Sequence, residues 1–359
     1  MSNGRRQQLA TSPVAHSGRP WLAGRESNPF GRLFNADDWS ARLIARVNRG
    51  VIRILSYHGV CRDADRAAPW VPSHYVTTSA LDDQLGLLRR AGAIVELGEL
   101  AALLRSGRVW REPLFVVTFD DAPANLLTLA QPILDAHGVC ATIFAVTDRL
   151  NDGDALPADK RQALFGRTRR GTAAPADASR IDPDVRERIR HMRRDEARAL
   201  ISAGHQLGAH TCTHVRLSYA NPACRRREIV ESVHAVRTAL DTDDVAFAYP
   251  YGQSTDFGSQ DVATLRACGV SIACTGIPGR NLPECEPLLL HRNCIGLYHD
   301  RAAFVAEMLS LRGYRSVRAV LGARRRAAMF ASTIARARRF DATYRPLRVK
   351  RAEEQASCR

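Results

Sequence analysis

The sequence predicts an α/β protein in which helices cover a parallel sheet. Short apolar runs rich in β-branched residues, typical of strands buried on both faces, recur along the chain. Segments with apolar residues at helical spacing alternate with these runs, and several of them end at a glycine. Repeated β-α units of this kind form either an open sheet or a barrel. In such barrels, the active groups lie at the carboxyl ends of the strands.

The elements follow in a regular order along the chain. Strands are expected at 51–57, 93–97, 114–119, 139–146, 205–209, 245–249, 270–275 and 287–291. Helices are expected at 79–92, 97–107, 124–138, 193–204, 222–240 and 259–269. The segment 79–92 illustrates the reasoning, because Leu81, Leu85 and Leu88 share one helical face and Gly92 ends the helix.

Composition divides the chain into four regions. Residues 1–35 are rich in Gly, Ser, Pro and Arg and are expected to be disordered. Residues 36–50 are expected to form a short amphipathic helix, and residues 51–300 a single α/β domain. Within that domain, an insertion at about 152–190 has weak periodicity and is expected to be a mobile loop. Residues 301–359 are expected to form a basic helical extension.

The short helix at 36–50 has one apolar and one basic face. Trp39, Leu43, Ile44 and Val47 share the apolar face. The basic face carries Arg42, Arg46 and Arg49. Such a helix either lies on an anionic membrane or packs its apolar stripe on the domain that follows.

The net charge of +15 is concentrated near the carboxyl end. Residues 311–359 hold fourteen Lys and Arg against three Asp and Glu, so they carry +11 of the total. A basic tail suggests an anionic partner, either nucleic acid or a membrane face, although an arginine-rich tail can also be merely solvated. The tail does not interleave aromatic residues at base-stacking spacing, which argues against nucleic acid.

Three further observations bear on location. No apolar run is long enough to span a membrane, no secretory signal is evident, and the nine cysteines include no C-x-x-C pair, which indicates reduced thiols. The expected location is the cytoplasm. If the basic segments bind anionic lipid, the protein lies at the inner face of the membrane.

A buried strand ends abruptly in two like charges in the segment "VVTFDDAPAN", residues 116–125. Asp120 and Asp121 can serve as turn and helix-cap residues, because Asp accepts hydrogen bonds from backbone N–H groups where a helix begins. Alternatively, one carboxylate holds a cation and its neighbour accepts protons. Taken alone, the pair leaves both interpretations open.

A pair of histidines favours the second interpretation. His210 and His214 are four residues apart in "GHQLGAHTCTHVRLS", so on a helical or tight-turn segment both imidazoles face the same way. Two His and one Asp, each at a strand end, would hold a metal and leave positions open for water and substrate. A metal such as Zn²⁺ lowers the pKa of a bound water to about 7, and the second Asp would then take its proton.

A third segment, "AFAYPYGQ", ends another expected strand with a tight turn. Pro250 fixes φ and Gly252 permits a sharp bend, so the backbone N–H of Tyr251 could point into a pocket and stabilise an oxyanion. In isolation, the same segment is also consistent with an ordinary aromatic-proline turn.

These segments together resemble a known family. The stretches "ILSYHGV", "TFDD", "HTCTH" and "AYPYG" are similar to the motifs of polysaccharide deacetylases, the carbohydrate esterase family four or NodB-homology domain, and occur in the family's order. The resemblance covers roughly residues 51–300, apart from the loop at 152–190. It implies a deformed (β/α) barrel that removes N-acetyl groups from sugars by metal-assisted hydrolysis.

The resemblance also implies roles for individual residues. The implied metal ligands, with Zn²⁺ as the expected ion, are Asp121, His210 and His214. Asp120 would act as the base. The backbone of Tyr251 would contribute to the oxyanion hole, and Pro250 and Tyr249 would shape its wall.

The sequence departs from the family pattern at several positions. Ala122 stands where the family usually has Gly. Many members place an Arg near the Pro-Tyr-Gly motif to orient the catalytic Asp, but residues 247–249 contain none, so Arg292 is the candidate substitute. His291 matches the family's Leu-x-His motif and is a candidate general acid. His58 is a competing candidate for the acid or for a substrate contact.

The function expected from these residues is metal-dependent removal of N-acetyl groups from an amino sugar. The substrate would be a glycan or a lipid-linked glycan precursor, as in exopolysaccharide or cell-envelope biosynthesis. The alternative is a non-catalytic glycan-binding protein on the same fold.

Overall fold

The computed structural model describes residues 39–157, 159–160, 181–241 and 244–311 of the chain. The expected disordered segment, most of the basic extension and the centre of the insertion lie outside these residues. In the part that is described, no helix is long and apolar enough to cross a membrane.

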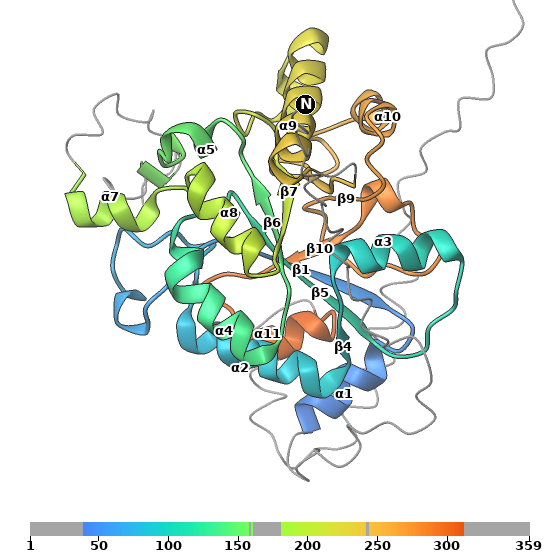
Figure 1. Cartoon of the computed structure of the whole chain (residues 1–359). Helices are drawn as coiled ribbons and strands as arrows, with labels where there is room; N and C mark the ends of the chain where they lie inside the picture. The colour runs from blue at the N-terminus through green and yellow to red at the C-terminus, as the bar shows by residue number, and fades with distance from the viewer. Residues whose placement is uncertain (1–38, 158, 161–180, 242–243, 312–359) are drawn as a thin grey trace, which may run out of the picture. The chain divides into compact units, whose positions relative to one another are not determined.

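A parallel sheet forms the centre of the described unit, as predicted (Figure 1). Its strands run in the spatial order β10-β1-β5-β6-β7-β8-β9, and β4 pairs with the start of β5. Their bounds are β1 Ile52–Tyr57, β4 Ala93–Ile94, β5 Leu114–Asp120, β6 Thr142–Ala145, β7 Gln206–Ala209, β8 Phe247–Ala248, β9 Ala273–Cys274 and β10 Arg292–Cys294. A separate pair joins β2 (Val60–Cys61) to β3 (Val76–Thr77).

The two ends of this strand order meet, which makes the sheet a nearly closed barrel. Leu290, two residues before β10, accepts a hydrogen bond from Thr275 N at 2.7 Å and donates one to Ala273 O at 3.0 Å. β9 therefore lies beside the segment that leads into β10. The expected deformed barrel is confirmed, and it decides between the two architectures that the sequence left open.

Helices surround the barrel in the pattern that the apolar stripes predict. They are α1 Trp39–Val47, α2 Thr78–Ala91, α3 Leu97–Ser106, α4 Gln131–His137, α5 Arg149–Asp152, α7 Pro183–Ile189, α8 Arg194–Ser202, α9 Pro222–Leu240, α10 Ser259–Ala267 and α11 Arg301–Met308. Single turns are η2 Asp63–Asp65, η5 Leu217–Tyr219 and η6 Pro287–Leu289, and η3 (Leu126–Ala130) is a π-helical turn that leads into α4.

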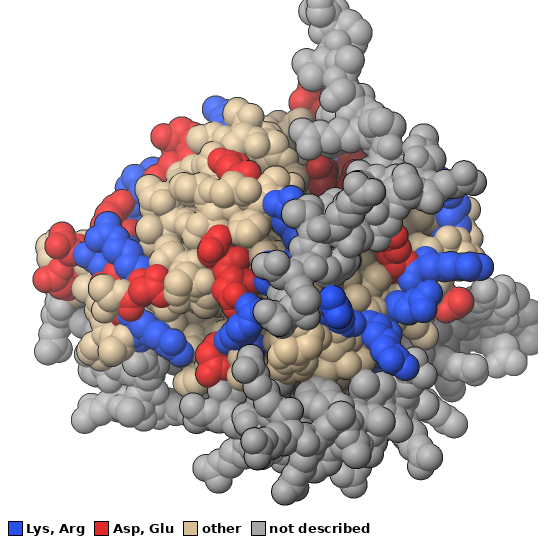
Figure 2. All heavy atoms as spheres, turned by 90° about the horizontal axis from the view of Figure 1, so that it is seen from below, with Lys and Arg blue, Asp and Glu red and all other residues tan. Residues whose placement is uncertain are grey.

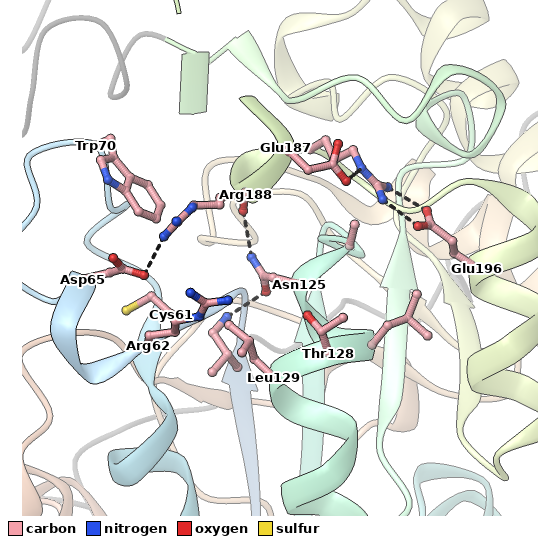
Figure 3. A pocket seen from close by; sticks show the side chains of 14 residues that line it. Cys61, Arg62, Asp65, Trp70, Asn125, Thr128, Leu129, Glu187, Arg188 and Glu196 are labelled. Carbon is pink, nitrogen blue, oxygen red and sulfur yellow. Dashed lines mark hydrogen bonds and ion pairs between the residues drawn. The ribbon is translucent and has the colours of Figure 1, made fainter. Parts of the chain in front are cut away.

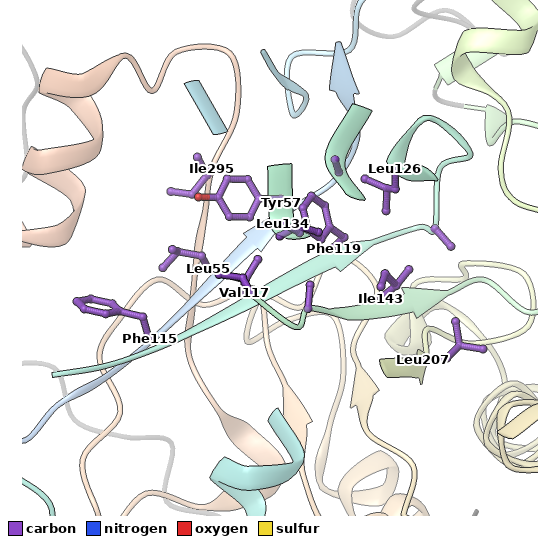
Figure 4. Close-up of a cluster of buried hydrophobic side chains, with 14 of the residues drawn as sticks. Leu55, Tyr57, Phe115, Val117, Phe119, Leu126, Leu134, Ile143, Leu207 and Ile295 are labelled. Atoms are coloured by element: carbon purple, nitrogen blue, oxygen red, sulfur yellow. The ribbon is translucent and has the colours of Figure 1, made fainter. Parts of the chain in front are cut away.

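Alternation along β1 and β5 separates the core from the site. Leu55, Tyr57, Val117 and Phe119 belong to the apolar core between sheet and helices, and the rings of Tyr57 and Phe119 stack 5.4 Å apart (Figure 4). Because side chains alternate faces along a strand, the residues between them point the other way. That opposite face of β5 ends in Asp120.

The helix α1 packs on the domain instead of presenting its apolar stripe to a membrane. Ala41 and Ile44 are fully buried in the main core, and α1 contacts α2 and α11. Trp39 remains 40% exposed, so the apolar face is not covered evenly. Of the two alternatives that the sequence leaves open for this helix, the structure shows packing on the domain, and the buried part of the stripe is not available for insertion into a membrane.

Two expected elements differ from the sequence-based assignment. The segment 287–291 begins as the turn η6, with Pro287 at its first position, and the last strand starts only at Arg292. The insertion at 152–190, expected to be a loop, contains the helix α7 at Pro183–Ile189. Asp182 caps this helix by accepting hydrogen bonds from the N–H groups of Asp184 and Val185.

Acidic and basic side chains are interspersed over the described surface in the view of Figure 2, without one large patch of a single sign. This agrees with the placement of most of the net charge in residues 311–359.

Candidate active site

Four strand ends bring the candidate residues together. Asp121 follows β5, His210 and His214 follow β7, and Tyr251 follows β8. His58 directly follows the last residue of β1. Parallel strands end at the same rim of the barrel, so residues far apart in sequence become neighbours.

The predicted ligand set forms one cluster. The Nε2 atoms of His210 and His214 lie 3.5 Å and 3.3 Å from Oδ1 of Asp121. Among the residues described, these three are the ones whose ligand atoms gather closely enough to hold a metal ion. Asp121 and His210 are buried, and His214 is half-buried and open to the rim.

The protonation pattern of the cluster fits a divalent cation. His210 Nδ1 lies 2.8 Å from the carbonyl oxygen of Ala248, so Nδ1 carries the proton and Nε2 presents a lone pair to Asp121. Burial lowers the pKa of His210 to about 4, which keeps the ring neutral at neutral pH. Oδ1 of Asp121 is buried and has no hydrogen-bond partner among the described residues. A cation between Oδ1 of Asp121 and Nε2 of His210, which lie 3.5 Å apart, would satisfy both atoms.

A buried carboxylate on α9 holds the loop that carries both histidines. Glu228 accepts hydrogen bonds from the N–H groups of Cys212 and Thr213, each at 2.9 Å, and from the Thr213 hydroxyl at 2.8 Å. The N–H of His214 donates to the Thr211 hydroxyl at 3.0 Å. These bonds fix the loop geometry independently of any ion.

Asp120 is held apart from this cluster by Arg292. Nη1 and Nη2 of Arg292 donate to the two carboxylate oxygens at 2.6 Å and 2.8 Å, and the Ser56 hydroxyl donates at 3.0 Å. Burial alone would raise the pKa of Asp120, but the charges of Arg292, His210 and His58 and the hydrogen bonds from Arg292 together outweigh it and lower the pKa to about 2. Arg292 is itself 2% exposed and donates from Nε to Thr275 O at 2.8 Å. The cation that residues 247–249 lack thus comes from β10.

A second group of ionisable residues lies beside His58. His58 Nε2 is 4.0 Å from Oδ2 of Asp121, and its ring centre lies 4.6 Å from that of His74, with the two rings tilted by 57°. His74 and His191 approach the two oxygens of Asp159 at 3.6 Å and 4.0 Å. Burial raises the pKa of Asp159 to about 8 and lowers the pKa of His74 to about 3, so these contacts are not ion pairs at neutral pH.

Sequence analysis did not identify this second group. His74 stands in no recognisable motif, and Asp159 and His191 flank the part of the insertion that is not described. The one signal was the histidine content of the chain, which does not indicate which rings meet.

The turn after β8 suits the expected role of Tyr251. Gly252 has φ +67° and donates to Pro250 O at 2.6 Å, and a Cβ at Gly252 would lie 2.2 Å from Gly276 N. The N–H of Tyr251 makes no hydrogen bond to another described group. Tyr249 is buried, and its hydroxyl donates a hydrogen bond to Leu288 O at 3.1 Å. This bond anchors the start of the turn to the core.

Backbone strain concentrates at this site. Seven non-glycine residues of the described chain have positive φ, and five of them lie in the three motif segments. These five are Asp121, Ala122, Thr211, His214 and Tyr251. Left-handed conformations of non-glycine residues cost about 1–2 kcal/mol each and cluster where function requires a particular geometry. Ala122, with φ +52°, thus adopts the conformation that a glycine would take at no cost.

His291 is placed differently from the other candidates. It directly precedes β10, which begins at Arg292, so by alternation its side chain points away from the side of Arg292. A Cβ on Gly279 would lie 2.5 Å from its Nδ1, so the ring packs against that glycine. His58, and not His291, therefore lies beside Asp121.

A separate pocket opens near β2, η3 and α7 (Figure 3). Its volume is about 250 Å³, and Trp70 and Leu129 contribute apolar walls. The charged groups drawn there are mostly paired with one another, as in the 2.8 Å contact between Arg188 and Asp65. This pairing leaves the pocket without a cluster of groups aimed at a ligand.

Known proteins match this chain in one sequence comparison and in fold. Residues 109–270 match the family model described as polysaccharide deacetylase. No curated protein sequence matches. The Streptococcus pyogenes deacetylase PplD, solved in complex with acetate, is 19% identical with a TM-score of 0.54, and the match covers 72% of this chain and 98% of that one.

Two further solved structures share the fold. A de-N-acetylase from Aggregatibacter actinomycetemcomitans is 16% identical with a TM-score of 0.53, and the match covers 72% of this chain and 99% of that one. IcaB from Ammonifex degensii is 18% identical with a TM-score of 0.52, and the match covers 72% and 97% of the respective chains. The family match over residues 109–270 and the shared barrel together show that this chain contains a polysaccharide deacetylase domain, the domain of a carbohydrate de-N-acetylase.

Proposed function

We propose that the protein removes N-acetyl groups from an amino sugar within a glycan or a lipid-linked glycan precursor, with a divalent metal held at its site. The observation that carries the proposal is that two carboxylates adjacent in sequence, Asp120 and Asp121, have different surroundings. Asp121 faces two imidazole nitrogens, whereas Asp120 faces a guanidinium and a hydroxyl. One carboxylate is thus available as a ligand and the other as a base.

The ion that fits the ligand set of one carboxylate and two imidazoles is a transition metal, and we propose Zn²⁺. Asp121, His210 and His214 would hold it. When bound, it would polarise the amide carbonyl and lower the pKa of a water to about 7.

The remaining chemistry belongs to the protein's own groups. Asp120 is ionised at neutral pH and oriented by two hydrogen bonds from Arg292, so it can accept the proton of the attacking water. The N–H of Tyr251 is free to donate to the oxyanion that forms as the amide carbonyl is attacked. The leaving amine then needs a proton.

We assign proton delivery to His58. It lies on the Asp121 side of the site, and its Nδ1 is buried without a hydrogen-bond partner among the described residues. The ring of His74 contacts that of His58, with the ring centres 4.6 Å apart. This assignment replaces His291 with the histidine that lies beside the candidate ligands.

The proposed class of substrate, N-acetylated glycans, rests on the comparisons with solved structures. One of the similar structures is a de-N-acetylase, and another, a deacetylase, contains acetate, the product of such a reaction. Exopolysaccharide or cell-envelope precursors are the N-acetylated glycans that we propose as substrates.

The test is acetate release from N-acetylated oligosaccharides by the zinc-loaded full chain. We expect acetate from the wild type and a fall in kcat of about 10²–10⁴-fold in Asp120→Asn, because the variant loses the base. The metal content of Asp120→Asn should equal that of the wild type, since Asp120 contacts Arg292 and not the ligand set.

The alternative, a non-catalytic glycan-binding protein, makes a different prediction. The protein would bind the oligosaccharides but release no acetate, and Asp120→Asn would change nothing. Equal acetate release by Asp120→Asn and the wild type would contradict the assignment of the base.

A further inference from the structure

Six arginines at one end of the barrel carry charges without a partner. They lie on α1, in the turn that follows it, at the end of α3 and in the loop that leads into β5: Arg42, Arg46, Arg49, Arg105, Arg108 and Arg111. All six are exposed, and none of their side chains makes an ion pair or a hydrogen bond with another described residue. Residues 39–50 and 105–112 contain one acidic residue, Glu112.

Backbone contacts join these segments into one surface. Gly50 N donates to Arg111 O at 3.1 Å, so the turn that carries Arg49 lies beside the loop before β5. Leu114 N, at the start of β5, donates to Val51 O at 3.0 Å. Because these segments precede β1 and β5, the surface lies at the amino ends of the strands, whereas the candidate metal ligands follow the carboxyl ends.

Apolar side chains stand among these arginines, so the surface is not a uniform basic patch. Val109, in the loop before β5, is 82% exposed, and Leu282 is 54% exposed. Leu282 belongs to the same end of the barrel, because nearby Arg280 donates to Val47 O, at the end of α1, at 3.4 Å. Exposed apolar groups mixed with basic ones are typical of surfaces that bind at a lipid interface.

The basic tail begins close to this surface. The described chain ends at Leu311, shortly after α11, and α11 contacts α1. Residues 311–359 carry +11 of the net charge. Two sources of positive charge thus start from one end of the barrel, and together they attract anionic surfaces.

The apolar residues decide between two kinds of anionic partner. A nucleic acid offers phosphates to the arginines but gains little from aliphatic side chains such as Val109 and Leu282. The interface of an anionic bilayer suits both, because its phosphates attract the arginines while aliphatic side chains enter the boundary with the acyl chains. This surface does not involve the stripe of α1 that is buried in the core.

We propose that the surface formed by the six arginines, Val109 and Leu282 docks on an anionic lipid bilayer, with the candidate active site facing away from it. The seven residues of β5 separate the docking surface from Asp120 by about 20 Å. Docking therefore leaves the site open to glycan that extends away from the bilayer. The proposal goes beyond the proposed function and does not depend on it, because none of these residues contacts the candidate ligands.

The experiment is flotation of the full-length protein with vesicles of phosphatidylcholine, with and without added phosphatidylglycerol. The wild type should bind only the anionic vesicles. Arg108→Glu/Arg111→Glu should weaken this binding about tenfold or more, because each arginine at a bilayer surface contributes to binding. Val109→Ser should weaken it about threefold, because it removes an apolar group from the lipid interface.

The matched control is Arg198→Glu/Arg226→Glu, which changes the net charge by the same amount. Both residues are exposed, on α8 and α9, and these helices contact β7. At about 0.1 M salt, charges more than about 10 Å from the bilayer are largely screened, so the control should bind within about twofold of the wild type. Circular dichroism should be that of the wild type for every variant.

Three results would overturn the proposal. One is equal binding of the wild type to neutral and anionic vesicles, which includes binding to neither. Another is an equal effect of the two double variants, which would assign the binding to net charge or to the tail. The third is unchanged vesicle binding by Val109→Ser, which would make the surface a general polyanion site, and binding of a DNA duplex would then identify nucleic acid as its partner.

Discussion

At the scale of single residues, the pair Asp120–Arg292 shows what the sequence reveals and what it hides. A carboxylate at the end of a buried strand requires a partner, and this requirement is evident from the sequence alone. The sequence makes Arg292 a candidate for that partner, but only the fold establishes it. β10 and β5 do not pair with each other, and they become neighbours of β1 only when the barrel forms.

The buried ion pair gives a prediction about stability. Arg292→Ala should lower the free energy of unfolding by about 3–5 kcal/mol, because it leaves Asp120 charged, buried and unpaired. Urea denaturation followed by circular dichroism measures the change. The control is Arg266→Ala, which removes an exposed pair with Glu286 and should cost less than about 1 kcal/mol. Equal costs for the two variants would contradict the structural account of the pair.

At the scale of elements, local patterns predicted long helices and buried strands well. The helix α9 begins and ends at the expected residues, because Asn221 caps it and Pro222 suits its first turn. The structure of segment 287–291 was harder to predict, because its leucines fit a strand as well as the observed turn η6. The histidine cluster around Asp159 was missed, since no local pattern indicates which loops meet.

The turn after β8 gives a prediction about rate. A Cβ at Gly276 would lie 2.2 Å from Tyr251 O, a backbone atom that can move only if the turn moves. Gly276→Ala should therefore displace the N–H of Tyr251 and lower kcat about 10–100-fold, up to the lower end of the roughly 10²–10³-fold cost of losing an oxyanion donor outright. Metal content should remain that of the wild type, because no ligand changes.

Acetate release and metal analysis of the same Gly276→Ala preparation separate these effects. An unchanged kcat would contradict the role of the turn. Parallel loss of metal and activity would show that the turn supports the ligand set instead of the oxyanion.

At the scale of the whole molecule, the barrel explains why four weak local signals become one site. Asp121, His210, His214 and Tyr251 follow three different strands, and the closed parallel sheet brings those strand ends to one rim. The motif order therefore allowed the fold and the ligand set to be predicted. Contacts that depend on how loops pack against one another, such as the contact between His58 and His74, could not be predicted from the sequence.

The central claim is that this rim holds a metal ion, and metal analysis tests it most directly. The untagged full-length protein, purified without chelator and reconstituted with zinc, should contain about one transition-metal ion per chain by mass spectrometry. His214→Ala and Asp121→Asn should lose it while keeping the circular dichroism of the wild type, and Asp120→Asn should retain it. Absence of bound metal from the folded wild type after zinc reconstitution would contradict the account.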